Sequence, residues 1–313
     1  MVTFSPDRQL EMRHFHKLLV VFASLSVSTL GWAQESVGST DAAPVTSSVL
    51  NRPAWEFGIG GGYFSGFDYP ASGDENRRFI VLPYFIYRTP LFRFGGGGVR
   101  AVAIERPKIK LDLSVGGSLN ASSDGNSARQ GMPDLDFLFE IGPQLEISLL
   151  DKAIASGGQL KLRFTSEVRA VLATDFRGID DQGFVAEAGI GMNYRNVRRS
   201  GIDLLAAFDV TYGNERLQDY FYEVDPEFAT QDRPEFDARG GYLQSELFVG
   251  IGLQPLKNVR VFVGSFTGLH DGASNEDSPL FEEKTTTGFA LGVVWRIAQS
   301  KRQVEIVDMG SNQ

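Results

Sequence analysis

Apolar and polar residues alternate along the segment Lys108–Asn120. Apolar or small residues occupy every second position from Ile109 to Leu119, and polar or small residues occupy the positions between them. Because successive side chains of a β-strand point to opposite faces, this pattern predicts a strand with one apolar and one polar face. Strands of about ten residues with this recurring alternation are typical of an outer-membrane β-barrel, which is apolar outside and polar inside.

The same alternation recurs between Ala54 and Ile297. Its longest example is Asp134–Leu149, where leucine, phenylalanine and isoleucine alternate with acidic and other polar residues. The other clear strands are expected at Ala54–Phe64, Phe79–Arg88, Gly158–Thr174, Gly183–Asn196, Gly201–Asn214, Gly241–Gln254, Asn258–His270 and Thr285–Ile297. Short connections alternate with long ones, as in barrels with short periplasmic turns and longer outer loops. The pattern therefore predicts an all-β, transmembrane antiparallel barrel.

Parity sets the expected number of strands. A barrel with both ends in the periplasm has an even number, so the stretch after Arg88 must hold two short strands, Leu91–Gly96 and Val99–Glu105. This gives about twelve strands, and ten or fourteen become possible if Gly95–Gly98 is a bulge. The expected segments are a signal peptide (1–33), a flexible periplasmic lead-in (34–53), the barrel (54–297) and a periplasmic C-terminal tail (298–313).

The N-terminus has the features of an export signal. Basic residues between Arg13 and Lys17 precede the apolar run Leu18–Leu30, and Gly31-Trp32-Ala33 is a small-x-small cleavage motif. We therefore expect cleavage before Gln34 and localisation in the outer membrane of a Gram-negative bacterium.

Composition narrows the possible chemistry. The chain has no cysteine, and His270 is the only histidine that follows the signal segment. This excludes thiolate nucleophiles, disulfides and multi-histidine zinc sites, and we expect neither a metal nor a cofactor. The formal net charge of −9 argues against nucleic acid as a partner, because nucleic-acid binders concentrate lysine and arginine.

Charged residues on the polar faces of the strands should line the lumen. They are Glu56, Lys110, Asp112, Glu140, Glu146, Arg163, Glu167, Arg169, Asp203, Asp209, Glu246 and Arg260. The mixture of signs favours a mutually paired polar filling of a narrow barrel. An ion-selective pore or a pair of catalytic carboxylates is the alternative.

Two segments are candidates for partner binding. Tyr220, Phe221 and Tyr222 lie in the acidic outer loop Glu215–Gly240, where they could anchor a partner or fold the loop back over the barrel mouth. Arg198 and Arg199 lie on a short basic turn, which could attract an acidic partner in the periplasm or hold lipid phosphates. The acidic outer loops could also hold cations that bridge lipopolysaccharide, although no tight calcium-loop spacing is present.

A surface lipid hydrolase is a further alternative. His270 is followed by Asp271 and lies near Ser265, and these residue types can form a catalytic triad. Proximity in the sequence is weak support for a triad, so we expect no catalytic residue and no enzymatic activity.

Several short segments, in their order and spacing, resemble the MipA/OmpV family of outer-membrane proteins from Trp55 to Ile297. They are Tyr69 with the loop that follows, Val81–Pro83, Arg129–Asp136, Tyr220–Val224, Ala229, Gly240-Gly241, Asp277–Leu280 and Gly288–Gly292. The resemblance implies a barrel and, for some members, a scaffold that joins a lytic transglycosylase to a penicillin-binding synthase. We therefore expect a non-enzymatic scaffold or envelope-integrity protein, with a narrow diffusion channel as the alternative.

Overall fold

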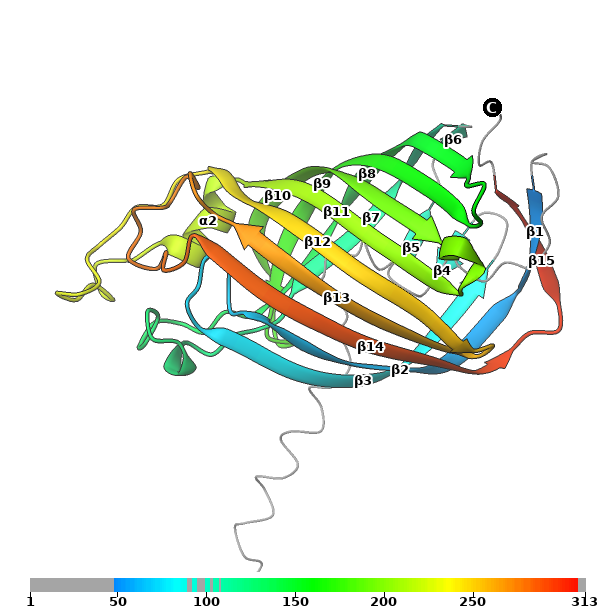
Figure 1. Cartoon of the computed structure of the whole chain (residues 1–313). Helices are drawn as coiled ribbons and strands as arrows, with labels where there is room; N and C mark the ends of the chain where they lie inside the picture. Colours follow the sequence, from blue (N-terminus) through cyan, green and yellow to red (C-terminus); the bar gives the residue numbers. More distant parts are fainter. Residues whose placement is uncertain (1–47, 89–91, 95–98, 102–103, 107, 309–313) are drawn as a thin grey trace, which may run out of the picture.

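A computed structural model describes residues 48–88, 92–94, 99–101, 104–106 and 108–308. Its main feature is a curled antiparallel sheet that forms the wall of a β-barrel (Figure 1). The expected signal peptide and most of the expected lead-in lie outside the described residues. No helix in the described part of the chain is long and apolar enough to cross a membrane.

Ten long strands build most of the wall. They are β2 (Trp55–Phe67), β3 (Glu75–Arg88), β7 (Ile109–Ser118), β8 (Phe137–Ala153), β9 (Gln159–Thr174), β10 (Asp180–Arg195), β11 (Ile202–Gly213), β12 (Gly241–Leu256), β13 (Val259–Leu269) and β14 (Thr285–Gln299). Each pairs with its neighbour in the sequence from β7 to β14, and β14 pairs with β2, which pairs with β3. The first and last long strands therefore meet, as expected for an up-and-down barrel.

Three short strands lie between β3 and β7. They are β4 (Phe92–Phe94), β5 (Val99–Ala101) and β6 (Ile104–Arg106); β4 pairs with β3 and β5, and β6 pairs with β7. The expected strand Leu91–Gly96 corresponds to β4. The expected strand Val99–Glu105 is divided between β5 and β6.

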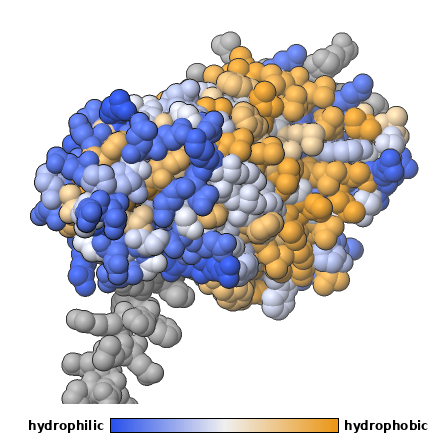
Figure 2. Space-filling view, turned by 60° about the vertical axis from the view of Figure 1, so that its left-hand side comes forward, coloured by the Kyte–Doolittle hydropathy of each residue, from blue (hydrophilic) through white to orange (hydrophobic). Residues whose placement is uncertain are grey.

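The two faces of the wall follow the alternation in the sequence. On β7, Asp112 and Ser114 are buried in the interior, whereas Leu111 and Leu113 lie on the other face. Large apolar side chains exposed around the outside include Phe79, Phe85, Phe184, Phe208, Phe289 and Trp295. Figure 2 shows a broad apolar surface on one face of the barrel, with a hydrophilic region at one end of the molecule. An apolar surface of this kind matches the hydrocarbon layer of a bilayer, so the chain is a transmembrane barrel.

The two ends of the barrel domain continue into a small separate sheet. Strand β1 (Ser48–Pro53) pairs antiparallel with β15 (Gln303–Asp308), and Arg52 lies opposite Val304. The sequence suggested a flexible lead-in and a tail at these positions. The structure instead joins the last residues of the lead-in to the tail, because backbone groups of two extended segments can pair whatever their side chains.

Candidate functional site

The interior of the barrel has a charged half and an apolar half. Strands β7 to β11 direct most of the charged side chains inward, including Asp112, Arg163 and Glu187. Strands β12 to β14 and β2 direct mainly glycine, alanine and phenylalanine inward, such as Phe248, Gly264 and Ala290. Each of these inward positions follows from the alternation along its strand.

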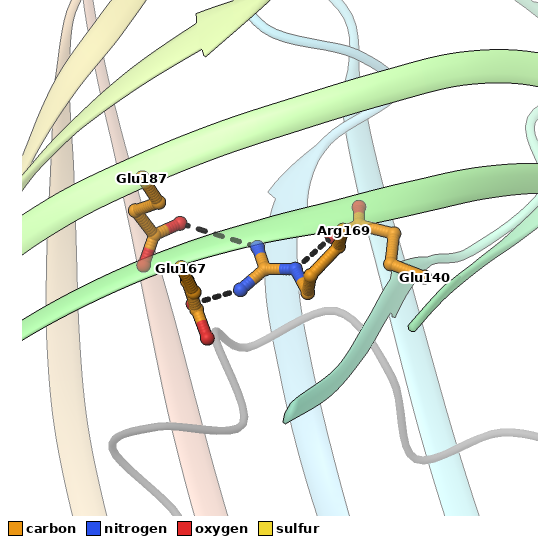
Figure 3. Close-up of polar contacts among 4 residues, drawn as sticks. All are labelled: Glu140, Glu167, Arg169 and Glu187. Atoms are coloured by element: carbon orange, nitrogen blue, oxygen red, sulfur yellow. Dashed lines mark hydrogen bonds and ion pairs between the residues drawn. The ribbon is translucent and has the colours of Figure 1, made fainter. Parts of the chain in front are cut away.

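Arg169 is at the centre of the charged half. Its Nε donates to Glu140 on β8 at 2.7 Å, and its Nη2 donates to Glu187 on β10 at 3.3 Å (Figure 3). Nη1 also pairs with Glu167, two residues earlier on β9. One guanidinium therefore links carboxylates on three neighbouring strands, an arrangement for which its planar fork of donors is suited. Glu187 was absent from the residues expected in the lumen, although the alternation in Gly183–Asn196 places it on the polar face.

Other charges in the interior form separate pairs. Lys110 pairs with Asp112 at 2.9 Å, and Arg163 pairs with Glu146 at 3.2 Å. Nearer the periplasmic end, Lys161 pairs with Asp151 at 3.2 Å and Arg296 with Glu56 at 3.4 Å. These residues form the mutually paired polar filling that the sequence predicts for the lumen. Asp209 and Glu246 differ, since neither has an ion pair or hydrogen bond through its side chain among the described residues.

The apolar half is built from rings that lie over glycines. Phe248 and Phe262 stack with their centroids 5.9 Å apart, and a Cβ at Gly250 would come within 2.8 Å of the Phe248 ring. Phe64 and Phe266 stack in the same way at 5.4 Å. Glycine at these positions leaves the space that the neighbouring rings occupy.

A hydrophobic cluster, here called the cap, fills the outer end of the barrel. Loop residues such as Tyr69, Tyr222 and Leu280 pack in it against inward residues at the outer ends of the strands, such as Val171 and Leu243. The helix α2 (Glu215–Tyr222) supplies part of the cap, and Figure 1 shows it at the outer end of the barrel. The Asn214 side chain accepts a hydrogen bond from Leu217 N, which caps the first turn of this helix.

Hydrogen bonds join the outer loops within the cap. The Tyr69 hydroxyl donates to the Leu280 carbonyl and the Tyr222 hydroxyl donates to the Pro70 carbonyl, both at 2.8 Å. Arg129 donates to the Phe221 carbonyl at 3.1 Å and lies over the Tyr69 ring. Burial lowers the pKa of Arg129 and raises those of Tyr69 and Tyr222. Several segments that carry the family resemblance thus meet in one place.

The three aromatic residues of the outer loop contribute to this cap. Tyr222 is fully buried, Phe221 is buried, and the partly buried Tyr220 accepts a hydrogen bond from Asp136 N at 2.6 Å. Of the two alternatives left by the sequence, the structure shows the loop folded back over the barrel mouth.

His270 also lies in the outer part of the molecule and is fully buried. Its Nε2 is 2.9 Å from the Thr286 hydroxyl, and burial lowers its pKa to about 4. Ser265 donates to the Gly288 carbonyl, and Asp271 pairs with Lys284. The structure therefore does not bring together the three residues considered for a hydrolase.

Arg198 and Arg199 form the tip of the turn between β10 and β11. Both are exposed, and both have left-handed backbone conformations, with φ of 49° and 64°. The turn packs against Gly157 in the neighbouring turn, where a Cβ would come within 2.7 Å of Arg199 Cγ. The two arginines are therefore presented from a closely packed turn at the end opposite the cap.

The part of the chain that the structure describes contains no group of three or more histidine or acidic side chains arranged to hold a metal ion. The interior and the cap thus show polar pairing and packing, and the basic turn is the exposed feature among the sequence candidates.

The chain matches one family model and is similar to several solved outer-membrane proteins. The model of the family described as MltA-interacting protein MipA matches residues 59–297. No curated protein matches the sequence. Similar solved structures include an outer membrane channel from Pseudomonas putida F1, with 11% identity over 82% of this chain and 100% of that chain and a TM-score of 0.43. The NanC porin has 10% identity over 77% of this chain and 100% of that chain, with a TM-score of 0.35.

Proposed function

The chain belongs to the family described as MltA-interacting protein MipA, and on that premise we propose that it is a non-enzymatic outer-membrane scaffold. Its partner would be a lytic transglycosylase, bound from the periplasm, and a penicillin-binding synthase would be the second enzyme that the scaffold recruits. The proposal includes export by a cleaved signal peptide ending at Ala33. The observation that carries it is the family membership named above.

The closed outer end supports a scaffold over an open channel. The cap packs loop residues onto the inward side chains of the strands, and Arg169 with its carboxylates occupies the interior below it. A porin needs a water-filled path, whereas a scaffold needs only a stable body and an exposed docking surface.

The periplasmic side offers such a surface. The turn with Arg198 and Arg199 is exposed, and a basic rim attracts an acidic partner surface with a strength that falls as salt rises. The sheet of β1 and β15 lies at the same end of the barrel (Figure 1) and provides backbone edges for a second contact.

The proposal is tested by capture of purified partner enzymes. The tagged mature protein, folded in detergent, is mixed with a purified transglycosylase of the MltA type or with a penicillin-binding synthase, at low and high salt. We expect capture of the transglycosylase by the wild-type protein and weaker capture by a variant with both Arg198→Ser and Arg199→Ser. Absence of capture by the wild-type protein would overturn the scaffold proposal.

A matched control removes equal charge from the opposite end. Arg177 lies in an outer loop and Arg216 in helix α2. Both side chains are exposed, and their replacement by serine should leave capture unchanged. Capture that is equal in all variants and insensitive to salt would remove the basic turn from the proposed surface and leave the chain ends. Anionic lipid vesicles serve as a separate probe for headgroup binding by the same arginines.

A further inference from the structure

The interior contains two pairs of acidic residues. In each pair, the two residues lie directly opposite each other on neighbouring strands. Glu167 on β9 is opposite Glu187 on β10, and Asp209 on β11 is opposite Glu246 on β12. Like charges at directly opposed positions of a sheet repel each other, so each pair needs a compensating group. The two pairs lie near each other, since both Asp209 and Glu246 interact electrostatically with Glu187.

The first pair has its compensating group within the chain. Arg169 pairs with Glu167 through Nη1 and with Glu187 through Nη2, so its guanidinium bridges the two carboxylates (Figure 3). Arg169 stands two residues after Glu167 on the same strand and faces the same way. It also pairs with Glu140, so its donors are already engaged.

The second pair has no bridging cation among the described residues, although Arg169 attracts Asp209 electrostatically from beyond ion-pair distance. No basic side chain pairs with Asp209 or Glu246 in the described parts of the chain, and neither carboxylate takes part in a hydrogen bond. Asp209 is only 6% exposed, so few water molecules can reach its carboxylate. Its Oδ1 lies over Gly189, where a Cβ would come within 1.9 Å, which places the carboxylate beside the backbone of β10. The position two residues after Asp209, where an arginine would match Arg169, is Thr211.

An apolar surface adjoins the second pair. Ala207 on β11 lies opposite Phe248 on β12. Ala207 is two residues from Asp209 and Phe248 is two residues from Glu246, so all four side chains lie on the same face of the sheet. Phe248 also pairs with Phe266 across to β13, and all three belong to one hydrophobic cluster with Phe262. A ligand that met both features would carry a positive charge at one end and an apolar body at the other.

We propose that Asp209 and Glu246 bind a monovalent organic cation, an ammonium or guanidinium ion on an apolar body. The charged group of the ligand lies between these two carboxylates, as the guanidinium of Arg169 lies between Glu167 and Glu187. Its apolar part lies on the surface formed by Ala207, Phe248 and Phe266, whose rings also favour a nearby cation. This site is separate from the periplasmic surface of the scaffold, and its occupation does not depend on a protein partner.

The first test is calorimetric titration of the folded mature protein in neutral detergent with benzylammonium, and with benzyl alcohol as an uncharged analogue. We expect saturable binding of benzylammonium at one site and none of the alcohol at the same concentrations. Asp209→Asn and Glu246→Gln should each weaken binding by about tenfold or more, because each removes a charge-assisted hydrogen bond. Asp203→Asn is the matched control, since Asp203 faces inward on β11 and already accepts from Asn196 N.

The second test fills the site from within the chain. Thr211→Arg places an arginine two residues after Asp209, just as Arg169 stands two residues after Glu167. The new guanidinium should therefore occupy the site and abolish benzylammonium binding. The heat-modifiable gel mobility of each variant confirms that the barrel is folded. Binding that is equal in the wild-type, Asp209→Asn and Thr211→Arg proteins would overturn the proposal. Tight stoichiometric binding of Ca²⁺ that excludes benzylammonium would also overturn it in favour of an inorganic ion.

Discussion

At the scale of single residues, the side of the sheet on which a side chain lies decides the solvent that it meets. Leu113 and Ser114 are neighbours on β7, yet Ser114 is buried in the interior and Leu113 lies on the lipid face. Ile141 lies on the lipid face of β8, where it is opposite Val115. The same chemical change should therefore have very different consequences at adjacent positions.

We expect Leu113→Arg and Ile141→Arg to reduce assembly strongly, and Ser114→Arg to reduce it far less. An arginine near the bilayer midplane costs about 2–4 kcal/mol, whereas one in the lumen meets polar groups. The measurement is the amount of membrane-integrated protein in extracted outer membranes. Equal integration of all three variants would show that the facing assignment is wrong.

Buried His270 meets the ring of Phe281, which packs against the cap, so it should make the stability of the cap depend on pH. Its pKa is lowered to about 4 by burial, so between about pH 4 and 6.5 the unfolded state binds a proton that the native state does not. Stability contributed by the neutral imidazole is therefore present above about pH 6.5 and is lost as pH falls towards 4. A shift of this size corresponds to about 3 kcal/mol.

Hydrogen exchange of the cap amides, followed from pH 7 to pH 4, measures this effect. The variant His270→Gln cannot titrate, so the difference between its pH profile and that of the wild-type protein isolates the histidine. Asp219 in α2 acts in the opposite sense, because burial raises its pKa to about 6 and its contribution to stability is lost as pH rises. Asp219 is present in both the wild-type protein and the His270→Gln variant, so its effect cancels in the difference. Parallel profiles would contradict the assignment to His270.

At the scale of elements, the outer loops act as one packed unit. Helix α2 is short, and an isolated helix of this length is marginal in water, so tertiary packing must hold it in place. Tyr222 contributes through complete burial, its hydrogen bond to Pro70 and an edge-on contact with Tyr69.

We expect Tyr222→Ala to open the cap and leave the barrel intact. Removal of a large buried aromatic ring costs about 3–5 kcal/mol, and the loss falls on loops that lie outside the barrel sheet. Limited proteolysis should then cleave within residues 223–240 faster than in the wild-type protein. Glu235→Ala, an exposed change in the same loop, is the control. Unchanged cleavage of the Tyr222 variant would mean that the cap does not depend on this ring.

At the scale of the whole molecule, the curled sheet and the capped outer end should determine behaviour in detergent and in bilayers. The pairing of β14 with β2 joins the ends of the long-strand series and leaves fewer free edges for solvent or denaturant. We expect the folded protein to migrate differently on gels with and without boiling. Equal mobility, or circular dichroism dominated by helix, would contradict a barrel.

Conductance across a planar bilayer distinguishes a capped barrel from a channel. We expect the wild-type protein to show little steady conductance, because the cap and the charged side chains occupy the interior. The Tyr222→Ala variant should conduct more, since it removes packing at the outer end. Large steady conductance of the wild-type protein would favour the diffusion channel over the scaffold.

The sequence by itself determined most of the barrel wall. Alternation is a local property, because a strand turns successive side chains to opposite faces whatever its neighbours are. It was therefore sufficient to place Asp112, Glu167 and Arg169 inside and Leu113 outside, and to locate the long strands. It could not show that β1 and β15 would pair, since the periodicity of a segment does not determine which distant segment it pairs with, or in which register.

Only the tertiary structure decided what meets in the interior and at the outer mouth. Tyr69, Arg129 and Leu280 lie in three different loops, and Tyr222 ends helix α2. No local pattern could show that these residues meet, because they are far apart in the sequence. Alternation likewise placed Asp209 and Glu246 on the inner face, but whether a charge has a partner depends on strand register. Register brings Arg169 between two carboxylates and leaves the next acidic pair without a cation.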